Sequence, residues 1–118
     1  GEVLEIPVGG VIQGSLYWYV EETPAVPSRI GLELREQGGR AVARLWEPPH
    51  FGDPPPTAWL ASWVYGDHHN LPLPADLPPG EYSLCLAVLE PSSSRALPWE
   101  DGGLADGYLC IGTVKIVR

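Results

Sequence analysis

The segment at residues 71–90, LPLPADLPPGEYSLCLAVLE, constrains the fold of this chain more than any other. It contains a Pro-Pro-Gly turn at residues 78–80, followed at once by strict alternation of side-chain type over residues 81–88. One face of this stretch carries Tyr82, Leu84, Leu86 and Val88, and the other carries Glu81, Ser83, Cys85 and Ala87. Alternation with a period of two residues predicts an antiparallel strand that buries one face.

The tyrosine that leads this strand gives a second structural signal. Tyr82 follows Gly80 by two residues, and this Gly-x-Tyr pattern after a corner resembles the tyrosine corner of Greek-key sandwiches. In that motif the hydroxyl bonds back to the preceding connection. We therefore expect structural roles for Gly80 and Tyr82, with Tyr82 buried and its hydroxyl bonded to a backbone group between Leu73 and Pro79. Leu84 stands where immunoglobulin domains place the cysteine that joins their two sheets.

Turn-forming residues divide the chain into seven predicted strands, and only one helical turn is expected, at residues 57–59. The clearest hairpin pairs residues 29–36 with residues 40–46 across Gln37-Gly38-Gly39. The predicted strands are Glu2–Ile6, Val11–Val20, Arg29–Glu36, Arg40–Trp46, Val64–Leu73, Glu81–Val88 and Tyr108–Val117. We predict an all-β, antiparallel immunoglobulin-like (Greek-key) β-sandwich of about seven strands.

Side-chain alternation also assigns faces within two of the other predicted strands. In residues 29–36, Ile30, Leu32 and Leu34 are expected to point inward, and Arg29, Glu33 and Arg35 outward. In residues 11–20, one face carries Leu16, Trp18 and Val20, and the other carries Ser15, Tyr17 and Tyr19.

Composition restricts the classes of partner. The chain has 118 residues, enough for a single domain with its own core, and a formal net charge of −8 with seven Lys and Arg. So few basic residues argue against a nucleic-acid partner and against an anionic membrane surface. The longest apolar run, residues 84–89, is too short to insert into a bilayer. Because Met is absent, we expect residues 1–118 to be one domain excised from a larger protein.

The two cysteines are expected to be free thiols. Cys85 lies on the face opposite Tyr82 and Leu84, whereas Cys110 shares its phase with Val114 and Ile116, which are expected to point inward. If both phases hold, the thiols face different sides of the sheet, and a disulfide requires matching faces. A Cys85–Cys110 bridge is the less favoured alternative.

Residues 52–117 resemble a known group of domains. The matching segments are Pro56-Thr57-Ala58-Trp59, Asp67, Leu71 to Tyr82, Arg95-Ala96-Leu97-Pro98 and Ile111-Gly112-Thr113-Val114, and Gly14 to Tyr19 is similar to the group's early strand. The chain thus resembles the C-terminal soluble β-sandwich domain of bacterial glycosyltransferase family 39-like membrane proteins. Residues 87–90, Ala-Val-Leu-Glu, depart from the Gly-Leu-Tyr-Asp type of stretch common there. The resemblance implies a domain on the extracytoplasmic face of a bacterial membrane, and it transfers no catalytic residue.

Aromatic residues are the candidate ligand-binding groups. Five Trp in 118 residues is a high number, and such side chains serve either as core anchors or as stacking platforms for sugars. We expect Phe51, Trp59 and Trp63 to be the most exposed, because they flank the irregular proline-rich segment 47–57. The core-anchor interpretation is favoured over ligand binding.

No metal, cofactor or catalytic site is predicted. His68 and His69 are adjacent on a predicted strand, so they point to opposite faces and do not share one ion. The segment 101–107, Asp-Gly-Gly-Leu-Ala-Asp-Gly, lacks the spacing of a calcium loop and is expected to form two Asp-Gly turns. The chain contains no nucleophile elbow, phosphate loop or His-Glu-x-x-His motif, and no carboxylate pair is singled out.

Two functions therefore stay open. The first is a non-catalytic accessory or interaction domain of a membrane glycosyltransferase-like protein, with the rest of the parent chain or another envelope protein as partner. The alternative is a carbohydrate-binding module that holds a glycan. Exposed aromatic side chains next to polar ones would favour the alternative, and buried tryptophans would favour the first.

Overall fold

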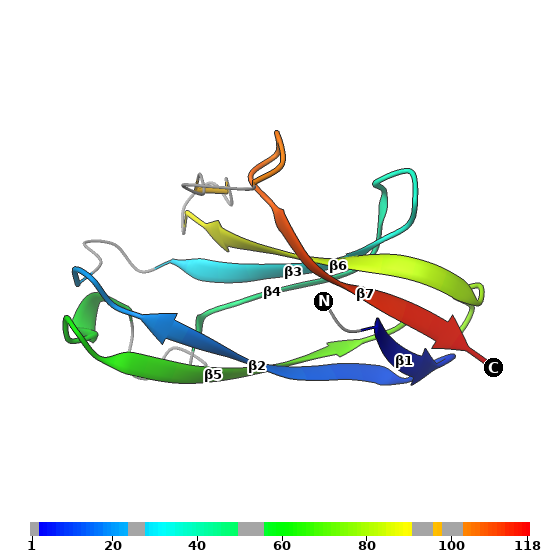
Figure 1. Ribbon diagram of the computed structural model, residues 1–118, viewed down its shortest axis with the longest axis horizontal. Coiled ribbons are helices and arrows are strands. Elements are labelled where there is room, and N and C mark those ends of the chain that lie inside the picture. Colours follow the sequence, from blue (N-terminus) through cyan, green and yellow to red (C-terminus); the bar gives the residue numbers. More distant parts are fainter. Residues whose placement is uncertain (1–2, 24–27, 50–55, 91–95, 98–102) are drawn as a thin grey trace.

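The computed structural model describes residues 3–23, 28–49, 56–90, 96–97 and 103–118, and every structural statement below concerns these residues. They form seven strands stacked in two layers, as Figure 1 shows, so the all-β prediction is confirmed. The predicted helical turn is a short 3-10 turn, Pro56–Ala58. The strands are β1 (Val3–Pro7), β2 (Val11–Tyr19), β3 (Arg29–Arg35), β4 (Ala41–Glu47), β5 (Val64–Pro72), β6 (Gly80–Leu89) and β7 (Leu109–Val117).

The strand order is that of a Greek-key sandwich. One sheet has the order β1-β7-β6-β3-β4, and the other contains β2 and β5. Strands β3, β6 and β7 occupy the positions of C, F and G in an immunoglobulin sandwich, and β2 and β5 occupy those of B and E. All pairings are antiparallel except that of β1 with β7, which is parallel, with Val3 opposite Thr113 and Pro7 opposite Val117.

The core lies between the two sheets and follows the predicted alternation. Inward-facing side chains of β3 and β6 pack with those of β2, β5 and β7. The larger cluster consists of Ile12, Leu34, Leu71, Leu73, Leu77, Tyr82, Val114 and Ile116, and the smaller one of Ile30, Leu32 and Leu86. The predicted inward positions of β3 and β6 are therefore confirmed.

The tyrosine corner is present. Tyr82 has 7% of its surface exposed, and its hydroxyl donates to the carbonyl oxygen of Pro78 at 2.6 Å. Gly80 leads into β6 with a φ of +147°, a conformation that side chains disfavour. Both residues thus have the structural roles expected from the Pro-Pro-Gly-x-Tyr pattern.

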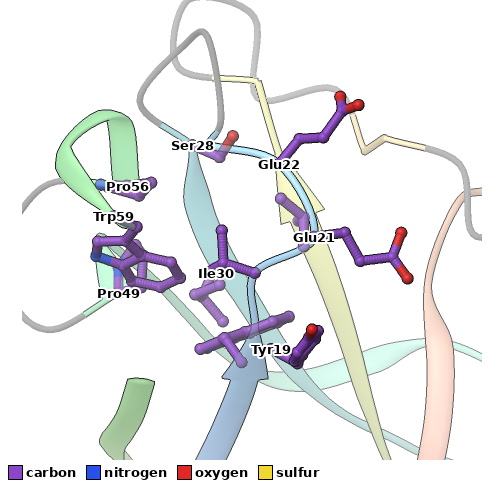
Figure 2. A pocket seen from close by; sticks show the side chains of 11 residues that line it. Tyr19, Glu21, Glu22, Ser28, Ile30, Pro49, Pro56 and Trp59 are labelled. Carbon is purple, nitrogen blue, oxygen red and sulfur yellow. The ribbon is translucent and has the colours of Figure 1, made fainter. Parts of the chain in front are cut away.

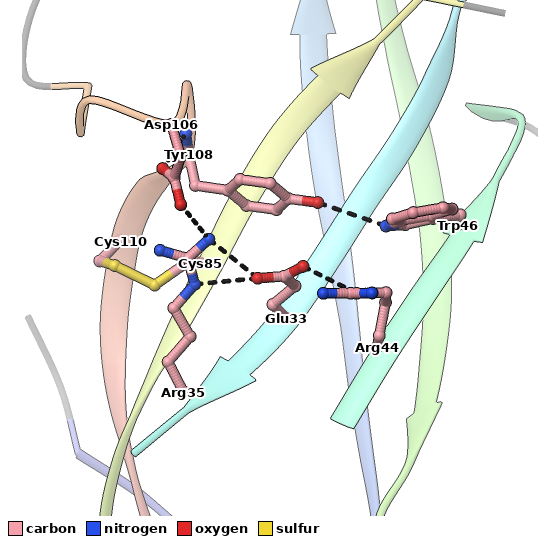
Figure 3. Close-up of polar contacts among 8 residues, drawn as sticks. All are labelled: Glu33, Arg35, Arg44, Trp46, Cys85, Asp106, Tyr108 and Cys110. Atoms are coloured by element: carbon pink, nitrogen blue, oxygen red, sulfur yellow. Dashed lines mark hydrogen bonds and ion pairs between the residues drawn. A yellow bond between two sulfur atoms is a disulfide. The ribbon is translucent and has the colours of Figure 1, made fainter. Parts of the chain in front are cut away.

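The prediction of free thiols is wrong. Cys85 and Cys110 form a disulfide, and each stands opposite the other on β6 and β7 (Figure 3). The register explains the error, because Leu84 pairs with Gly112 whereas Cys85 pairs with Cys110, so β7 contains an extra residue at Ile111. This β-bulge reverses the phase of the strand beyond it. Cys110 therefore faces away from the core that Val114 and Ile116 enter, on the same side as Cys85.

Glu33 and Arg35 point to the outer face of β3, as predicted, but they are buried there. Only 3% of Glu33 is exposed, and Arg35 is also buried. The reason is that the end of the β6–β7 connection packs over this face, where Tyr108 joins Cys85, Ala87 and Leu89 in a third buried cluster. The five-stranded sheet is therefore covered on both faces over part of its area.

Candidate functional site

The outer face of the two-stranded sheet carries the most prominent exposed aromatic side chains of the described residues. Tyr17 and Tyr19 of β2 are 75% and 60% exposed. They project on the same face because they are two positions apart on one strand. On β5, Tyr17 is opposite Gly66 and Tyr19 is opposite Val64, which is also exposed. The face is therefore an aromatic surface on a narrow, solvent-facing sheet.

Glycine on β5 gives Tyr17 its position. A side-chain carbon at Gly66 would lie 3.4 Å from Cε1 of Tyr17, so the ring leans across the strand onto the glycine backbone. Aromatic rings commonly cover a glycine on a neighbouring strand in this way. One edge of the ring thus rests on the sheet, and most of its surface stays open to solvent.

Polar side chains continue the same face beyond the tyrosines. Ser15 Oγ lies 3.3 Å from Nδ1 of His68, and Nε2 of His68 lies 3.2 Å from Oδ1 of Asn70. With the Asn70 oxygen as acceptor, Nε2 of His68 donates and Nδ1 accepts the Ser15 hydroxyl proton. This arrangement orients the three side chains, and Asn70 is exposed to solvent. Ser15, His68 and Asn70 thus offer both hydrogen-bond donors and acceptors to a ligand, and neither Ser15 nor Asn70 carries a charge.

The three aromatic candidates from the sequence have different outcomes. Trp63 is 56% exposed, as expected; it directly precedes β5, and its ring stacks with Tyr65 with centroids 6.4 Å apart. The expectation of an exposed Trp59 is wrong, because its ring is 5% exposed and stacks on Tyr65 with centroids 4.6 Å apart. Trp59 thus anchors the turn that follows the proline-rich segment. Phe51 lies outside the described residues.

A pocket opens between the two sheets beside Trp59. Its volume is about 610 Å³, and Trp18, Ile30, Val88 and Pro56 contribute apolar walls. Figure 2 shows Trp59 and Pro49 on one side, while the side chains of Glu21 and Glu22 extend outward on the other. The pocket is therefore mostly apolar at its base, with carboxylates at its margin.

A network of ion pairs centred on the buried Glu33 and Arg35 lies on the outer face of the five-stranded sheet (Figure 3). The carboxylate of Glu33 accepts from Arg35 at 2.8–2.9 Å and from Arg44 at 2.8 Å. Arg35 also donates to Asp106 at 2.7 Å, and its guanidinium lies over the ring of Tyr108. Each charge thus has an opposite partner, which is the condition under which buried ion pairs persist.

The network changes the pKa of its members. Burial works against the ionised carboxyl of Asp106, but hydrogen bonds from the Tyr108 backbone N–H and from Arg35 outweigh it and lower the pKa of Asp106. Burial likewise opposes the charge of Arg35, and the bonds to Asp106 and Glu33 nevertheless raise the pKa of Arg35. Burial raises the pKa of Tyr108.

The ring of Tyr108 crosses β3 at Gly31. A Cβ atom at Gly31 would lie only 2.7 Å from the Tyr108 hydroxyl oxygen.

A second polar chain crosses the interior between the sheets. His69 bonds Glu47 through Nδ1 and Asp67 through Nε2, the latter at 2.7 Å, and Trp18 donates to the same Asp67 oxygen at 3.0 Å. Strands β2, β4 and β5 supply these residues, so the chain ties the two sheets together. Asp67 and His69 are almost fully buried, which suits a structural connection.

The structure describes the histidine pair and one of the two predicted Asp-Gly turns, whereas Asp101-Gly102 lies outside the described residues. His68 is exposed and His69 is buried, so the adjacent histidines do point to opposite faces. Asp106 and Gly107 form a turn in which the Tyr108 N–H donates to Asp106 Oδ1 and Gly107 has a φ of +86°. No cluster of three metal-ligating side chains occurs in the described part of the chain.

Comparison with known proteins finds no matching family model, curated protein or solved structure. The described residues also contain no helix with the length and apolar character needed to cross a bilayer.

Chemically, the face around Tyr17 is suited to binding by ring stacking and neutral hydrogen bonds. Sequence reasoning placed Ser15, Tyr17 and Tyr19 on one face but did not select them as a site. The sequence of β2 nevertheless indicated a site, because both faces of this strand carry aromatic side chains and only one face can enter the core. On β2 the rings on the other face, those of Tyr17 and Tyr19, are the exposed ones.

Proposed function

We propose that this chain is a non-catalytic recognition domain that binds carbohydrate through the outer face of β2 and β5. The observation that carries the proposal is the exposed pair Tyr17 and Tyr19, followed along the same face by Ser15, His68 and Asn70. Sugar rings present apolar C–H faces and many hydroxyl groups. A site with open aromatic rings beside oriented neutral polar groups satisfies both needs.

An extracytoplasmic setting is part of the proposal. The Cys85–Cys110 disulfide supports it, because such bonds persist in oxidising compartments and are rare in the cytosol. The resemblance to domains of glycosyltransferase family 39-like membrane proteins suggests a bacterial envelope protein as the parent. That parentage rests on the sequence segments alone.

The test is a titration of the intact domain with neutral oligosaccharides, followed by calorimetry and by tyrosine and tryptophan fluorescence. We expect saturable binding that Tyr17→Ala and Tyr19→Ala each weaken by about tenfold, since one stacking contact contributes about 1 kcal/mol or more. Leu104→Ala is the matched control, because Leu104 is an exposed apolar side chain outside this face. Binding that both tyrosine variants retain in full would contradict the proposal.

A docking domain is the second candidate function, and exposed apolar side chains at the end of the sheet that carries Tyr19 favour it. Val64 is opposite Tyr19 and is 60% exposed, and Leu60 and Trp63, which come shortly before Val64 in the chain, are also more than half exposed. Tyr and Trp are enriched at protein–protein interfaces, and clusters of exposed aromatic and apolar side chains form the centres of such interfaces. Here the partner is the rest of the parent chain or another envelope protein.

Site-specific crosslinking in the full-length parent protein separates the two candidates. A photoreactive amino acid at position 63 should give one defined protein crosslink if the face docks on a protein. The same group at Leu104 is the control and should give none. Crosslinking at position 63 without sugar binding would support the docking function over the carbohydrate function.

A further inference from the structure

The free edge of β2 differs from the other open strand edges of the sandwich. Among the described strands, β2 pairs only with β5. The Val20 N–H bonds the Trp63 carbonyl and the Leu73 N–H bonds the Gly10 carbonyl, so even-numbered residues of β2 face β5. The backbone groups of the odd-numbered residues, Val11 to Tyr19, therefore point toward the open edge.

The other open edges carry devices that discourage pairing. β1 has Glu5 and ends at Pro7, and β4 carries Arg44 and Glu47. β5 has the inward-pointing Asp67 and ends at a proline. Charged side chains, prolines and inward-pointing charges are the usual protection of edge strands. β2 has none of these over nine residues, and no charged residue occurs between Glu5 and Glu21.

We infer that β2 is the dimer interface of this domain, and that its occupant is β2 of a second copy, paired antiparallel about a two-fold axis. Full overlap of Val11–Tyr19 with itself centres the axis on Ser15. In that register each odd-numbered residue is opposite an odd-numbered residue, so the free N–H and C=O groups meet in hydrogen-bonded pairs. The register that pairs all nine residues of β2 is therefore also the register in which the free backbone groups can form hydrogen bonds.

The side chains of β2 complement one another in this register. Tyr19 is opposite Val11 of the second copy, which is an aromatic and β-branched pair of the favourable kind. On the inner face, Gly14 is opposite the second copy's Leu16. Nothing lies within 4 Å of the position that a Cβ of Gly14 would take, so space for that leucine exists. No charge is brought against a like charge anywhere along the strand.

The dimer would join two copies of the outer face into one continuous four-stranded surface. Tyr17 and Tyr19 of both copies would stay on its solvent side, because edge pairing leaves the faces of a sheet open. The inference does not depend on carbohydrate binding, since it rests on the edge of β2 and not on its outer face.

The first test is the mass of the intact domain by analytical ultracentrifugation over a wide range of concentrations. We expect a monomer–dimer equilibrium that strengthens with added salt, because each copy carries a net charge of −8 and β2 itself carries none. A monomer at every concentration, or open-ended polymers, would overturn the inference.

Charge substitution at the two-fold axis gives the sharper test. Ser15→Lys and Ser15→Glu each place two like charges opposite one another and should raise the dimer Kd by about 100-fold. Mixing the two variants should restore dimers that contain one chain of each, which a folding defect would not do. Asn70→Lys is the control on β5 and should leave the dimer intact. A dimer that persists in Ser15→Lys would overturn the inference.

Hydrogen exchange measured by NMR provides a residue-specific readout. The amides of Ser15, Tyr17 and Tyr19 should become protected as concentration rises, whereas those of Leu16 and Trp18 should be protected throughout. As a probe of other occupants, a synthetic peptide with the sequence of residues 11–19 is added to the domain. A domain that stays monomeric and yet binds this peptide would overturn the inference and assign the edge to a strand from a different protein.

Discussion

The Tyr82 hydroxyl donates to the Pro78 carbonyl oxygen at 2.6 Å and fixes the corner from which β6 begins. Tyr82→Phe should lower the free energy of unfolding by about 1 kcal/mol, and somewhat more because the carbonyl loses its partner. Urea denaturation measures this difference. Tyr17→Phe is the control, since the Tyr17 ring is exposed and its loss of a hydroxyl should leave the midpoint unchanged.

The Cys85–Cys110 bond should contribute measurably to stability. It closes a loop with a sequence separation of 25, for which the chain-entropy relation gives about 3.5 kcal/mol. Adding reductant should therefore lower the urea midpoint of the domain. The double variant Cys85→Ala, Cys110→Ala should start from a lower midpoint and show no response to reductant. Equal midpoints of the original chain with and without reductant would contradict the bond.

Removing the central carboxylate of the charged network should be strongly destabilising. Glu33→Ala leaves Arg35 without one of its two carboxylate partners in a buried position, and such losses typically cost about 3 kcal/mol. Chemical denaturation measures the effect. Glu36→Ala is the matched control, because Glu36 pairs with Arg40 on the surface and its loss should have little effect. Equal effects of the two substitutions would contradict a structural role for the network.

Acid should weaken the contribution of Asp106. The pKa of Asp106 is lowered in the folded state, so its ionised form stabilises the fold at pH values above the unfolded pKa of about 3.9. That stabilisation is lost as the pH falls through the lower folded-state pKa. The difference in unfolding free energy between the original chain and Asp106→Asn should therefore shrink between about pH 5 and pH 2. A difference that stays constant over this range would contradict the assignment.

The strands were predictable because each carries its own alternation and is bounded by turn residues. β3 and β6 show this most clearly, since Leu34 and Leu86 lie in the core as their spacing requires. The tyrosine corner was predictable for the same reason, because turn and tyrosine are adjacent in sequence. Local patterns thus determine the elements, and they determine the faces of strands that pair without a bulge.

The disulfide and the buried charges were not predictable from local patterns. Nothing in the sequence of β7 marks the bulge at Ile111. The bulge is seen only in the way β7 pairs with β6. Burial of Glu33 depends on the chain returning over β3 more than 70 residues later, at Asp106 and Tyr108. Such contacts join distant segments, so spacing within either segment does not reveal them.

The parallel pairing of β1 with β7 gives the domain a defined response to mechanical force. β1 and β7 are the first and last of the described strands, and they lie side by side, as Figure 1 shows. Their pairing runs from Val3 opposite Thr113 to Pro7 opposite Val117. Tension applied to the two ends of the chain pulls these strands along their length in opposite directions. The backbone hydrogen bonds between them are then loaded in shear and must break together, whereas an antiparallel pair pulled at one end would open bond by bond.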